Sequence, residues 1–268
     1  YPSSGLQYFL GLDDTSAPTQ VADGRAQAMQ NVIVGVTADL RKRDGISVIG
    51  NILDIPGEDY CVVNGLAYTR FVGGVDRIVA VCGPRPYYFN GSTWVLISTP
   101  ALTTTSQNAQ WVITTALDSL VATNGSDPPS QWAGGTGSPW TTVAFTGLTN
   151  TIQSARTAAF FKNYLIFGNI TEAGINYPTR LRWPSVGTIT TWTDADRNDV
   201  DAQMGEELNC LGQLHGDLYL GFTNSVYRAS YVGGASTFTF TRVLDNIGCT
   251  AKNSMQQMTL SDGQTGLV

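Results

Sequence analysis

The sequence predicts an all-β protein, a β-propeller of four-stranded antiparallel blades with an N-terminal arm. The chain has 268 residues and is 42% hydrophobic, which is enough for a sizeable core. Its 29 glycines and 11 prolines indicate frequent turns. Only 13% of the residues are charged, against about 25% in an average globular protein, so the charged faces of long surface helices are missing.

The third observation is an internal repeat, in which an apolar strand end, a tight polar turn and a four-residue strand recur. The equivalent positions are Ile78, Leu120, Leu165 and Leu218, with spacings of 42, 45 and 53 residues. A blade of this length cannot bury both of its faces alone, so neighbouring blades stack around an axis. Four units are recognisable and a fifth begins. A β-sandwich is the alternative, although it does not require the same turn-and-strand signature at each step.

Each unit continues with a second turn and a third strand. Asn-Gly favours such turns because both central positions of a type I′ turn need positive φ. The predicted second turns are Asn90-Gly91, Asn124-Gly125, Gly168-Asn169 and Thr223-Asn224. The predicted third strands are Trp94 to Ile97, Leu181 to Trp183 and Ser225 to Tyr227.

The first 45 residues differ from the rest of the chain. Residues 13–18 have turn and cap chemistry, and Ala22 to Val32 has the best helical propensity in the sequence. We therefore expect an arm over residues 1–45, with a short helix or an extended segment, and a propeller domain over residues 46–268 that is incomplete at its C-terminal end.

Composition excludes several classes of protein. The net charge of −6 argues against a freely diffusing nucleic-acid binder, which needs many basic residues facing the phosphates. No apolar run is long enough to predict a membrane-spanning helix. Four widely spaced cysteines and a single histidine do not have the spacing of a zinc site. Two disulfides are conceivable, but without an export signal buried reduced thiols are favoured.

The densest acidic cluster, Asp194 to Asp201, is the one candidate cation site. Alternating carboxylates suit Ca²⁺, but Asp199 stands where a calcium loop needs glycine, and Gly205 stands where it needs a bidentate glutamate. A solvated loop between strands is therefore the preferred interpretation.

No catalytic set is predicted. His215 lies in a predicted hairpin turn, and no G-x-S-x-G elbow occurs. Aspartates near strand ends could serve as a glycosidase pair, but aspartate is common in turns for backbone reasons alone. These aspartates are Asp59, Asp118, Asp127 and Asp217. We therefore expect a non-enzymatic protein without cofactor or resident metal.

The most distinctive short segment of the sequence is the basic run Arg41, Lys42 and Arg43 beside a glycine turn. In a chain this poor in charge, these cations could contact phosphate or an acidic partner. A solvated loop that precedes the first strand is the alternative.

The arrangement of several segments resembles the β-propeller tail proteins of short-tailed bacteriophages, of the tail nozzle or packaged-DNA-stabilisation type. The segments that carry this resemblance are Asp23-Gly24-Arg25-Ala26, residues 40–45, residues 88–94, residues 122–128, residues 180–185, Ser225-Val226-Tyr227 and residues 231–234.

The resemblance implies a structural virion protein. Such a protein would be assembled in the host cytoplasm and would form a cyclic homo-oligomer, a hexamer in this family. The ring would lie below the portal and adaptor, contact other tail or fibre proteins, and retain and channel the packaged DNA, which passes through it transiently. Arg41, Lys42 and Arg43 match the family's basic step before the first strand, which implies an interface or DNA-facing position.

Two other functions remain open at this stage. One is a glycan-binding or glycan-cleaving propeller that acts on a host surface. The other is a soluble scaffold that binds a peptide on an end face of the propeller.

Overall fold

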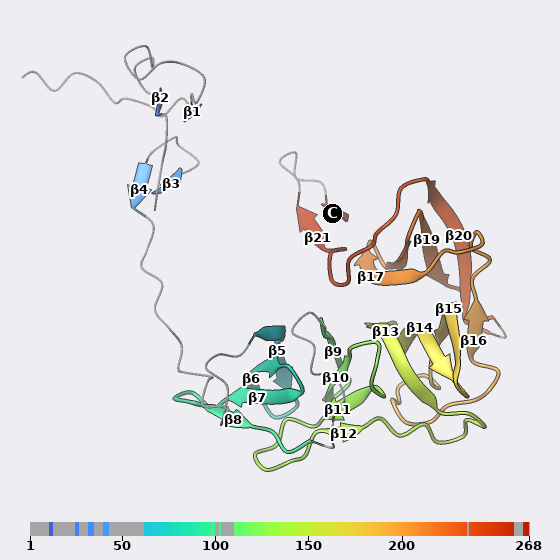
Figure 1. Cartoon of the computed structure of the whole chain (residues 1–268), viewed down its shortest axis with the longest axis horizontal. Coiled ribbons are helices and arrows are strands. Elements are labelled where there is room, and N and C mark those ends of the chain that lie inside the picture. The colour runs from blue at the N-terminus through green and yellow to red at the C-terminus, as the bar shows by residue number, and fades with distance from the viewer. Residues whose placement is uncertain are drawn as a thin grey trace, which may run out of the picture. The chain divides into compact units, whose positions relative to one another are not determined.

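The computed structural model describes residues 62–99, 102, 110–234, 236–259 and 265–267, together with the backbone of four short strands before residue 43. The chain divides into two compact units, residues 1–49 and 50–268. All regular elements among the described residues are strands, which confirms the all-β prediction (Figure 1).

In the second unit, four separate sheets follow one another along the chain, and each is a four-stranded antiparallel meander. We call them blades 1 to 4. Blade 1 contains β5 (Val63–Phe71), β6 (Val75–Cys82), β7 (Arg85–Phe89) and β8 (Trp94–Leu96). Blade 2 contains β9 (Val112–Ala116), β10 (Ser119–Thr123), β11 (Ser130–Trp132) and β12 (Thr141–Thr142). Blade 3 contains β13 (Ile152–Phe161), β14 (Tyr164–Glu172), β15 (Ile175–Arg182) and β16 (Arg197–Asp199). Blade 4 contains β17 (Leu208–Leu214), β18 (Asp217–Phe222), β19 (Ser225–Tyr231) and β20 (Phe238–Asp245).

The remaining strands form two-stranded pairs. In the first unit, β1 (Gly11–Leu12) pairs with β2 (Arg25–Ala26) in parallel, and β3 (Val32–Val34) pairs with β4 (Leu40–Lys42) antiparallel. After blade 4, β21 (Gln257–Thr259) and β22 (Thr265–Leu267) form an antiparallel pair that contacts β17. This pair corresponds in position to the predicted beginning of a fifth unit.

Successive blades pack through their first strands, since β5 contacts β9, β9 contacts β13, and β13 contacts β17 (Figure 1). Three hydrophobic clusters lie one at each blade junction. The first joins blades 1 and 2, the second blades 2 and 3, and the third blades 3 and 4. One junction for each pair of consecutive sheets is a propeller arrangement, whereas a sandwich has one core between two sheets.

The alternation of side chains along each second strand produces these junctions. In β10, Leu120 and Ala122 belong to the cluster with blade 1, whereas Val121 belongs to the cluster with blade 3. In β14, Leu165 faces blade 2 and Ile166 faces blade 4. Because successive residues of a strand point to opposite faces, four or five apolar residues in a row serve two cores.

Glycines allow the blades to approach closely at two of the junctions. A Cβ at Gly65 of β5 would lie 2.8 Å from the Cβ of Trp111, which directly precedes β9. A Cβ at Gly168 of β14 would lie 2.5 Å from Cδ2 of Leu208 in β17. Both distances are shorter than real Cβ contacts, so a side chain at Gly65 would have to displace Trp111, and one at Gly168 would have to displace the end of the Leu208 side chain.

The first hairpins of blades 2, 3 and 4 confirm the predicted repeat. Their two-residue turns are Leu117-Asp118, Lys162-Asn163 and His215-Gly216. Lys162, Asn163, His215 and Gly216 all have positive φ, as type I′ turns require. His215 is exposed in its turn, as predicted.

Three predicted details are wrong. In blade 1, the repeat predicts its first turn at Asp76 and Arg77, but both residues lie inside β6, because the turn is formed earlier by residues 72–74. Gly168 and Asn169 lie inside β14, where the register shifts and Asn169 adopts a φ of 52°. This is a bulge within a strand, so the dipeptide that resembles a turn does not end the strand.

The third wrong detail concerns the last strand of blade 1. Asn90-Gly91 connects β7 to β8, so Trp94 to Leu96 form the fourth strand of the blade and not the third. The predicted sequence of turns was shifted by one strand because the β6–β7 turn, at Gly83-Pro84, is shorter and less polar than the turn that follows it.

Two further predictions fall partly on residues that the structure leaves out. Most of the helix predicted over residues 22–32 lies outside the described residues, but Arg25, Ala26 and Val32 are in strands. The cysteines also differ in part from the prediction. Cys210 and Cys249 are free, as predicted, but Cys82 is disulfide-bonded.

The junction between blades 3 and 4 provides a test of the packing. Leu218 is fully buried there, and Leu218→Ala should lower the free energy of unfolding by about 2–5 kcal/mol because it leaves a cavity. Leu96→Ala, at a half-exposed position of blade 1, is the matched control and should change it by less than about 1 kcal/mol. Urea denaturation followed by tryptophan fluorescence measures both, and equal effects would contradict the assignment of Leu218 to the core.

Candidate functional site

A polar cavity of 480 Å³ lies where blades 2, 3 and 4 meet the loop that follows blade 4. We call it the polar cavity. Three elements supply most of it: the turn after β10, the neighbouring strands β13 and β14, and the loop at Lys252. Its lining consists of Asn124, Gly125, Ser126, Ser154, Arg156, Asn169, Thr171, Asn176, Glu207 and Lys252.

Lys252 brings an ammonium group to this cavity. Its Nζ donates hydrogen bonds to the backbone oxygens of Asn124, at 2.6 Å, and Gln110, at 3.5 Å. Burial and, to a lesser extent, the charge of Arg156 lower the pKa of Lys252 to about 8. Among the described residues, no carboxylate lies within ion-pairing distance of this nitrogen.

Arg156 supplies a second cation. Its NH1 lies 3.6 Å from Oε2 of Glu207, whereas its buried Nε has no hydrogen-bond partner among the described residues. The lining therefore contains two cationic side chains and one carboxylate. This net positive charge stands out in a chain whose overall charge is −6.

Hydroxyl and amide groups complete the lining. Ser154 donates from Oγ to Oγ1 of Thr171 at 3.0 Å, and Asn169 donates from Nδ2 to the Leu208 backbone oxygen at 3.1 Å. Asn169 reaches blade 4 from the β14 bulge, where its positive φ re-aims the side chain. Such a lining can hold an anion that also carries hydroxyl groups.

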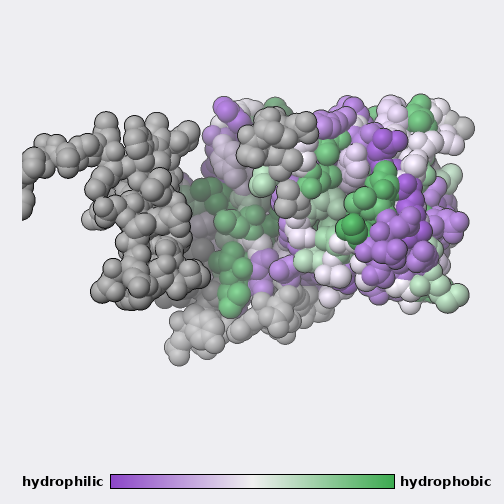
Figure 2. Space-filling model, turned by 90° about the horizontal axis from the view of Figure 1, so that it is seen from above, coloured by the Kyte–Doolittle hydropathy of each residue, from purple (hydrophilic) through white to green (hydrophobic). Residues whose placement is uncertain are grey.

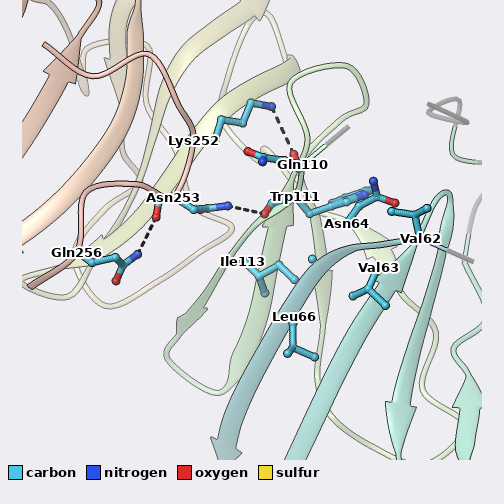
Figure 3. A pocket seen from close by; sticks show the side chains of 11 residues that line it. Val62, Val63, Asn64, Leu66, Gln110, Trp111, Ile113, Lys252, Asn253 and Gln256 are labelled. Carbon is cyan, nitrogen blue, oxygen red and sulfur yellow. Dashed lines mark hydrogen bonds between the residues drawn. The ribbon is translucent and has the colours of Figure 1, made fainter. Parts of the chain in front are cut away.

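A second cavity, of 700 Å³, lies on the other side of Lys252, between β5, β9 and the same loop (Figure 3). Asn253 donates from Nδ2 to the Trp111 backbone oxygen at 3.0 Å, and Gln256 donates from Nε2 to the Asn253 backbone oxygen at 3.1 Å. The chain that leaves blade 4 is thus hydrogen-bonded to the start of β9 in blade 2. The loop from Cys249 to Gln256 separates the two cavities and contributes to both.

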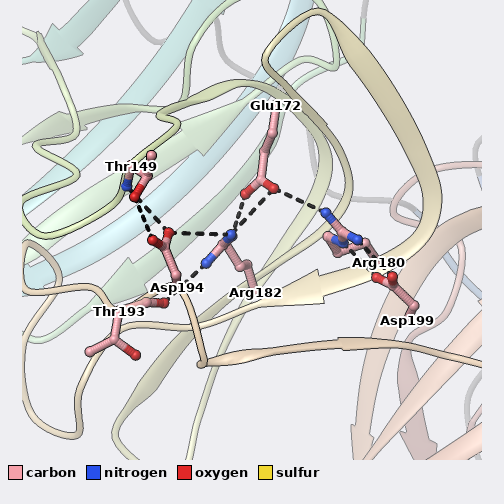
Figure 4. Close-up of polar contacts among 7 residues, drawn as sticks. All are labelled: Thr149, Glu172, Arg180, Arg182, Thr193, Asp194 and Asp199. Atoms are coloured by element: carbon pink, nitrogen blue, oxygen red, sulfur yellow. Dashed lines mark hydrogen bonds and ion pairs between the residues drawn. The ribbon is translucent and has the colours of Figure 1, made fainter.

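The acidic cluster predicted from the sequence is part of an ion-pair network on blade 3 (Figure 4). Glu172 of β14, 5% exposed, accepts hydrogen bonds from both Arg180 and Arg182 of β15. Asp199 binds Arg180 through both oxygens, at 2.5 and 2.6 Å. The guanidinium of Arg180 also lies 3.6 Å from the centre of the Tyr177 ring.

Asp194 joins the network from the loop before β16. It accepts hydrogen bonds from the backbone nitrogen and Oγ1 of Thr149, and it lies 3.9 Å from Arg182. Hydrogen bonds from Thr149 lower the pKa of Asp194, and those from Arg180 lower the pKa of Asp199. Within the part of the chain that the structure describes, no three histidine, cysteine or acidic side chains are grouped as metal ligands. The carboxylates of Asp194 and Asp199 are therefore engaged in internal ion pairs, and residues 197–199 form β16 instead of part of the solvated loop that the sequence suggested.

The other sequence-derived candidates do not come together. Asp118 caps the first hairpin of blade 1 by accepting from the Val72 nitrogen at 2.6 Å, and Asp127 accepts from Asn124 at 2.8 Å. Asp217 lies 3.9 Å from Arg228, and Asp59 lies outside the described residues. These are the backbone and pairing roles that aspartates have in turns.

The basic run falls at the limit of the described residues. Arg41 and Lys42 are in β4, opposite β3, but their side chains are not described, and Arg43 lies outside the described residues. The role predicted for these three residues stays a prediction.

The polar cavity was missed at the sequence level. Arg156 interrupts an otherwise small and apolar strand, and Lys252 follows the last recognised unit, so each is unusual in its own segment. Neither signal reveals that residues almost 100 positions apart meet. The free thiols add no site, because burial raises the pKa of Cys210.

No protein-family model matches this sequence, and the search of curated proteins finds no match either. The similarity to solved structures is low in both sequence identity and TM-score. The chain is similar to the extracellular domain of a one-component system from B. thetaiotaomicron, at 11% identity and a TM-score of 0.33, over 79% of this chain and 37% of that one. A second structure, described as belonging to a hybrid two-component system of the same organism, gives 12% identity and a TM-score of 0.30 over the same shares of the two chains.

The ion-pair network provides a test of stability. Glu172→Gln should lower the free energy of unfolding by about 3–5 kcal/mol, because it leaves the buried Arg180 and Arg182 without their shared carboxylate. Glu207→Gln removes a half-exposed partner and should cost no more than about 1 kcal/mol. Urea denaturation at pH 7 compares the two variants. Similar losses would mean that the buried network contributes no more than a surface pair.

The buried ammonium predicts a pH dependence. Because the folded pKa of Lys252 is about 8 and the unfolded value is about 10.4, the unfolded chain binds more protons between these values. The free energy of unfolding contributed by this group therefore rises as the pH increases from about 8 to 10.4. Lys252→Met should lack this increase, as measured by urea denaturation from pH 7 to 10.5. A parallel profile in the variant would contradict the lowered pKa.

Proposed function

We propose that this protein is a non-enzymatic structural component of a short bacteriophage tail, in which copies assemble into a closed ring. The observation that carries the proposal is the state of the two outermost blade faces. Blades 2 and 3 each bury apolar side chains on both faces, whereas blades 1 and 4 each have one face that no other described blade covers. On blade 4, Met255 and Leu267 of the segment that follows the blade lie against part of this face.

The outer face of blade 1 exposes apolar side chains in its first and last strands, whereas Ala80 of β6 and Tyr87 of β7, on the same face, are buried. Leu66 is 67% exposed and Tyr68 is 64% exposed in β5, and Leu96 of β8 is half-exposed. Leu66 is on the same face as Leu96, because its register partners across the sheet are Ala80, Tyr87 and Leu96 in turn.

The outer face of blade 4 has a similar character. An open apolar hollow of 670 Å³ lies on it, lined by Val226, Leu244 and Ile247 among others. Leu244 and Ile247 are 45% and 61% exposed. Figure 2 shows that hydrophobic residues reach the surface in separate patches among hydrophilic ones. Faces of this kind elsewhere in the chain are covered by a blade, so a blade of another copy is a suitable occupant.

Contacts between blade 1 of one copy and blade 4 of the next are heterologous. They close into a ring only where the rotation between neighbours permits it, and the sequence resemblance implies six copies. The portal, adaptor and other tail proteins would then meet the ring, and DNA would pass through it. A lumen that passes DNA should not hold it tightly, which agrees with the net charge of −6.

A propeller that binds glycans at a host surface is the second candidate. The polar cavity is the feature that favours it, since polar cavities of this volume hold small ligands. Among the described residues, no helix is present that is long and apolar enough to cross a membrane.

The assembly proposal predicts the behaviour of charged variants at the two faces. Leu66→Glu and Leu244→Glu should each shift the particle from a multi-subunit ring to a monomer, because a carboxylate would be buried at the contact without a partner. Ile175→Glu, at a similarly exposed position at the start of β15 in blade 3, should leave the ring intact. Light scattering and electron microscopy of the purified chain and of tails measure the result. A homogeneous monomer, or the absence of the protein from purified tails, would refute the proposal.

A further inference from the structure

We propose that the polar cavity binds a carboxylate-bearing sugar through the juxtaposed cations of Lys252 and Arg156. This inference develops the glycan-binding candidate and is independent of ring assembly. It rests on charge, hydrogen-bonding capacity and volume.

The first argument for this ligand is the charge of the cavity lining. The ammonium of Lys252 is held in the cavity by carbonyl oxygens, which solvate it but do not neutralise it. The charge of Arg156 lowers the pKa of Lys252. The carboxylate that pairs with Arg156 is Glu207, which is half-exposed. Two cations face one carboxylate across the cavity, so a single additional negative charge balances the lining.

The second argument is the guanidinium of Arg156. The Arg156 side chain is 35% exposed and lines the cavity, and its NH1 lies 3.6 Å from Glu207. Its Nε is enclosed by protein, so a ligand would contact the exposed end of the guanidinium. A carboxylate can accept from a guanidinium and from a nearby ammonium at the same time.

The neutral groups distinguish a sugar from a simple ion. Ser126, Ser154, Thr171 and Asn176 line the same cavity and offer hydroxyl and amide groups. Such groups both donate and accept, as the hydroxyls of a sugar ring do. The volume of 480 Å³ is in the range of pockets that hold a small ligand.

The charge balance also argues for a monoanion. A phosphate dianion would exceed the single excess positive charge and would face the carboxylate of Glu207. A uronic acid carries one negative charge and several hydroxyls. The inferred ligand class is therefore an acidic sugar, such as the uronate unit of a surface polysaccharide.

Binding to the full chain can be measured by calorimetry and by ligand-observed NMR at pH 7. The probes are glucuronate, glucose as the neutral counterpart, and inorganic phosphate. We expect saturable binding of glucuronate, with glucose and phosphate much weaker. Absence of saturable glucuronate binding, or tighter binding of phosphate, would overturn the inference.

Variants locate the site. Lys252→Gln and Arg156→Gln should each weaken glucuronate binding about tenfold or more, since each removes a charge-assisted hydrogen bond. Lys162→Gln removes an exposed lysine in the β13–β14 turn and is the control that should bind as the parent chain does. Unchanged binding in Lys252→Gln would show that the sugar lies elsewhere, against the proposal.

A steric variant covers the case in which loss of a cation unfolds the chain. Asn176→Trp keeps both cations and places a large side chain at an exposed position on the rim of the cavity, so it should abolish binding without loss of fold. Binding that persists in this variant would overturn the inference. Ring assembly is read out separately by light scattering, so failure of sugar binding and failure of the tail proposal are distinguishable.

The pH profile is an additional readout. The charged groups that face Lys252 across the cavity are Arg156 from β13 and Glu207 from the segment before β17. Affinity for glucuronate should fall as the pH rises through about 8, where Lys252 loses its proton. A constant affinity between pH 7 and 9.5 would mean that Lys252 does not contact the carboxylate.

Discussion

The division of each blade's apolar side chains between two neighbours is the constraint on which the rest of the structure depends. Leu120 and Val121 are adjacent in β10, yet they belong to different cores. Burial of apolar surface is the main favourable term in folding. A blade therefore reaches its full stability only when each of its two faces is covered by a neighbouring blade. The polar cavity and the exposed outer faces both follow from this stacking, because they lie where strands of different blades meet or where stacking stops.

Much of this architecture could be predicted from local sequence. Runs such as Leu165-Ile166-Phe167 and the two-residue turns before them were sufficient to identify three of the four hairpins and the repeat. The errors arose where one dipeptide can serve two conformations. Gly168-Asn169 has the composition of a turn, but packing against Leu208 keeps both residues in a strand as a bulge.

The candidate sites were less predictable because they depend on contacts across the fold. The carboxylates of residues 194–201 suggested a cation, and their partners proved to be arginines 12 to 19 positions away, on the adjacent strand β15. Lys252 and Arg156 are each unusual in their own segments, but neither segment indicates that the two residues meet. Their shared cavity exists only because the loop after blade 4 passes close to the turn after β10. The roles of Arg41, Lys42 and Arg43 remain predictions from sequence.

The hydrogen bonds from Lys252 and Asn253 to blade 2 have a consequence for how the chain comes apart. Linear arrays of repeats lose their terminal units first, because each end has one neighbour instead of two. Here the segment that leaves blade 4 is hydrogen-bonded to residues 110, 111 and 124, more than 120 positions earlier. Blade 4 cannot separate from blade 2 while these hydrogen bonds are intact. The segment after blade 4 therefore couples the end of the array to its middle, and blades 2 to 4 unfold more cooperatively than a linear array would.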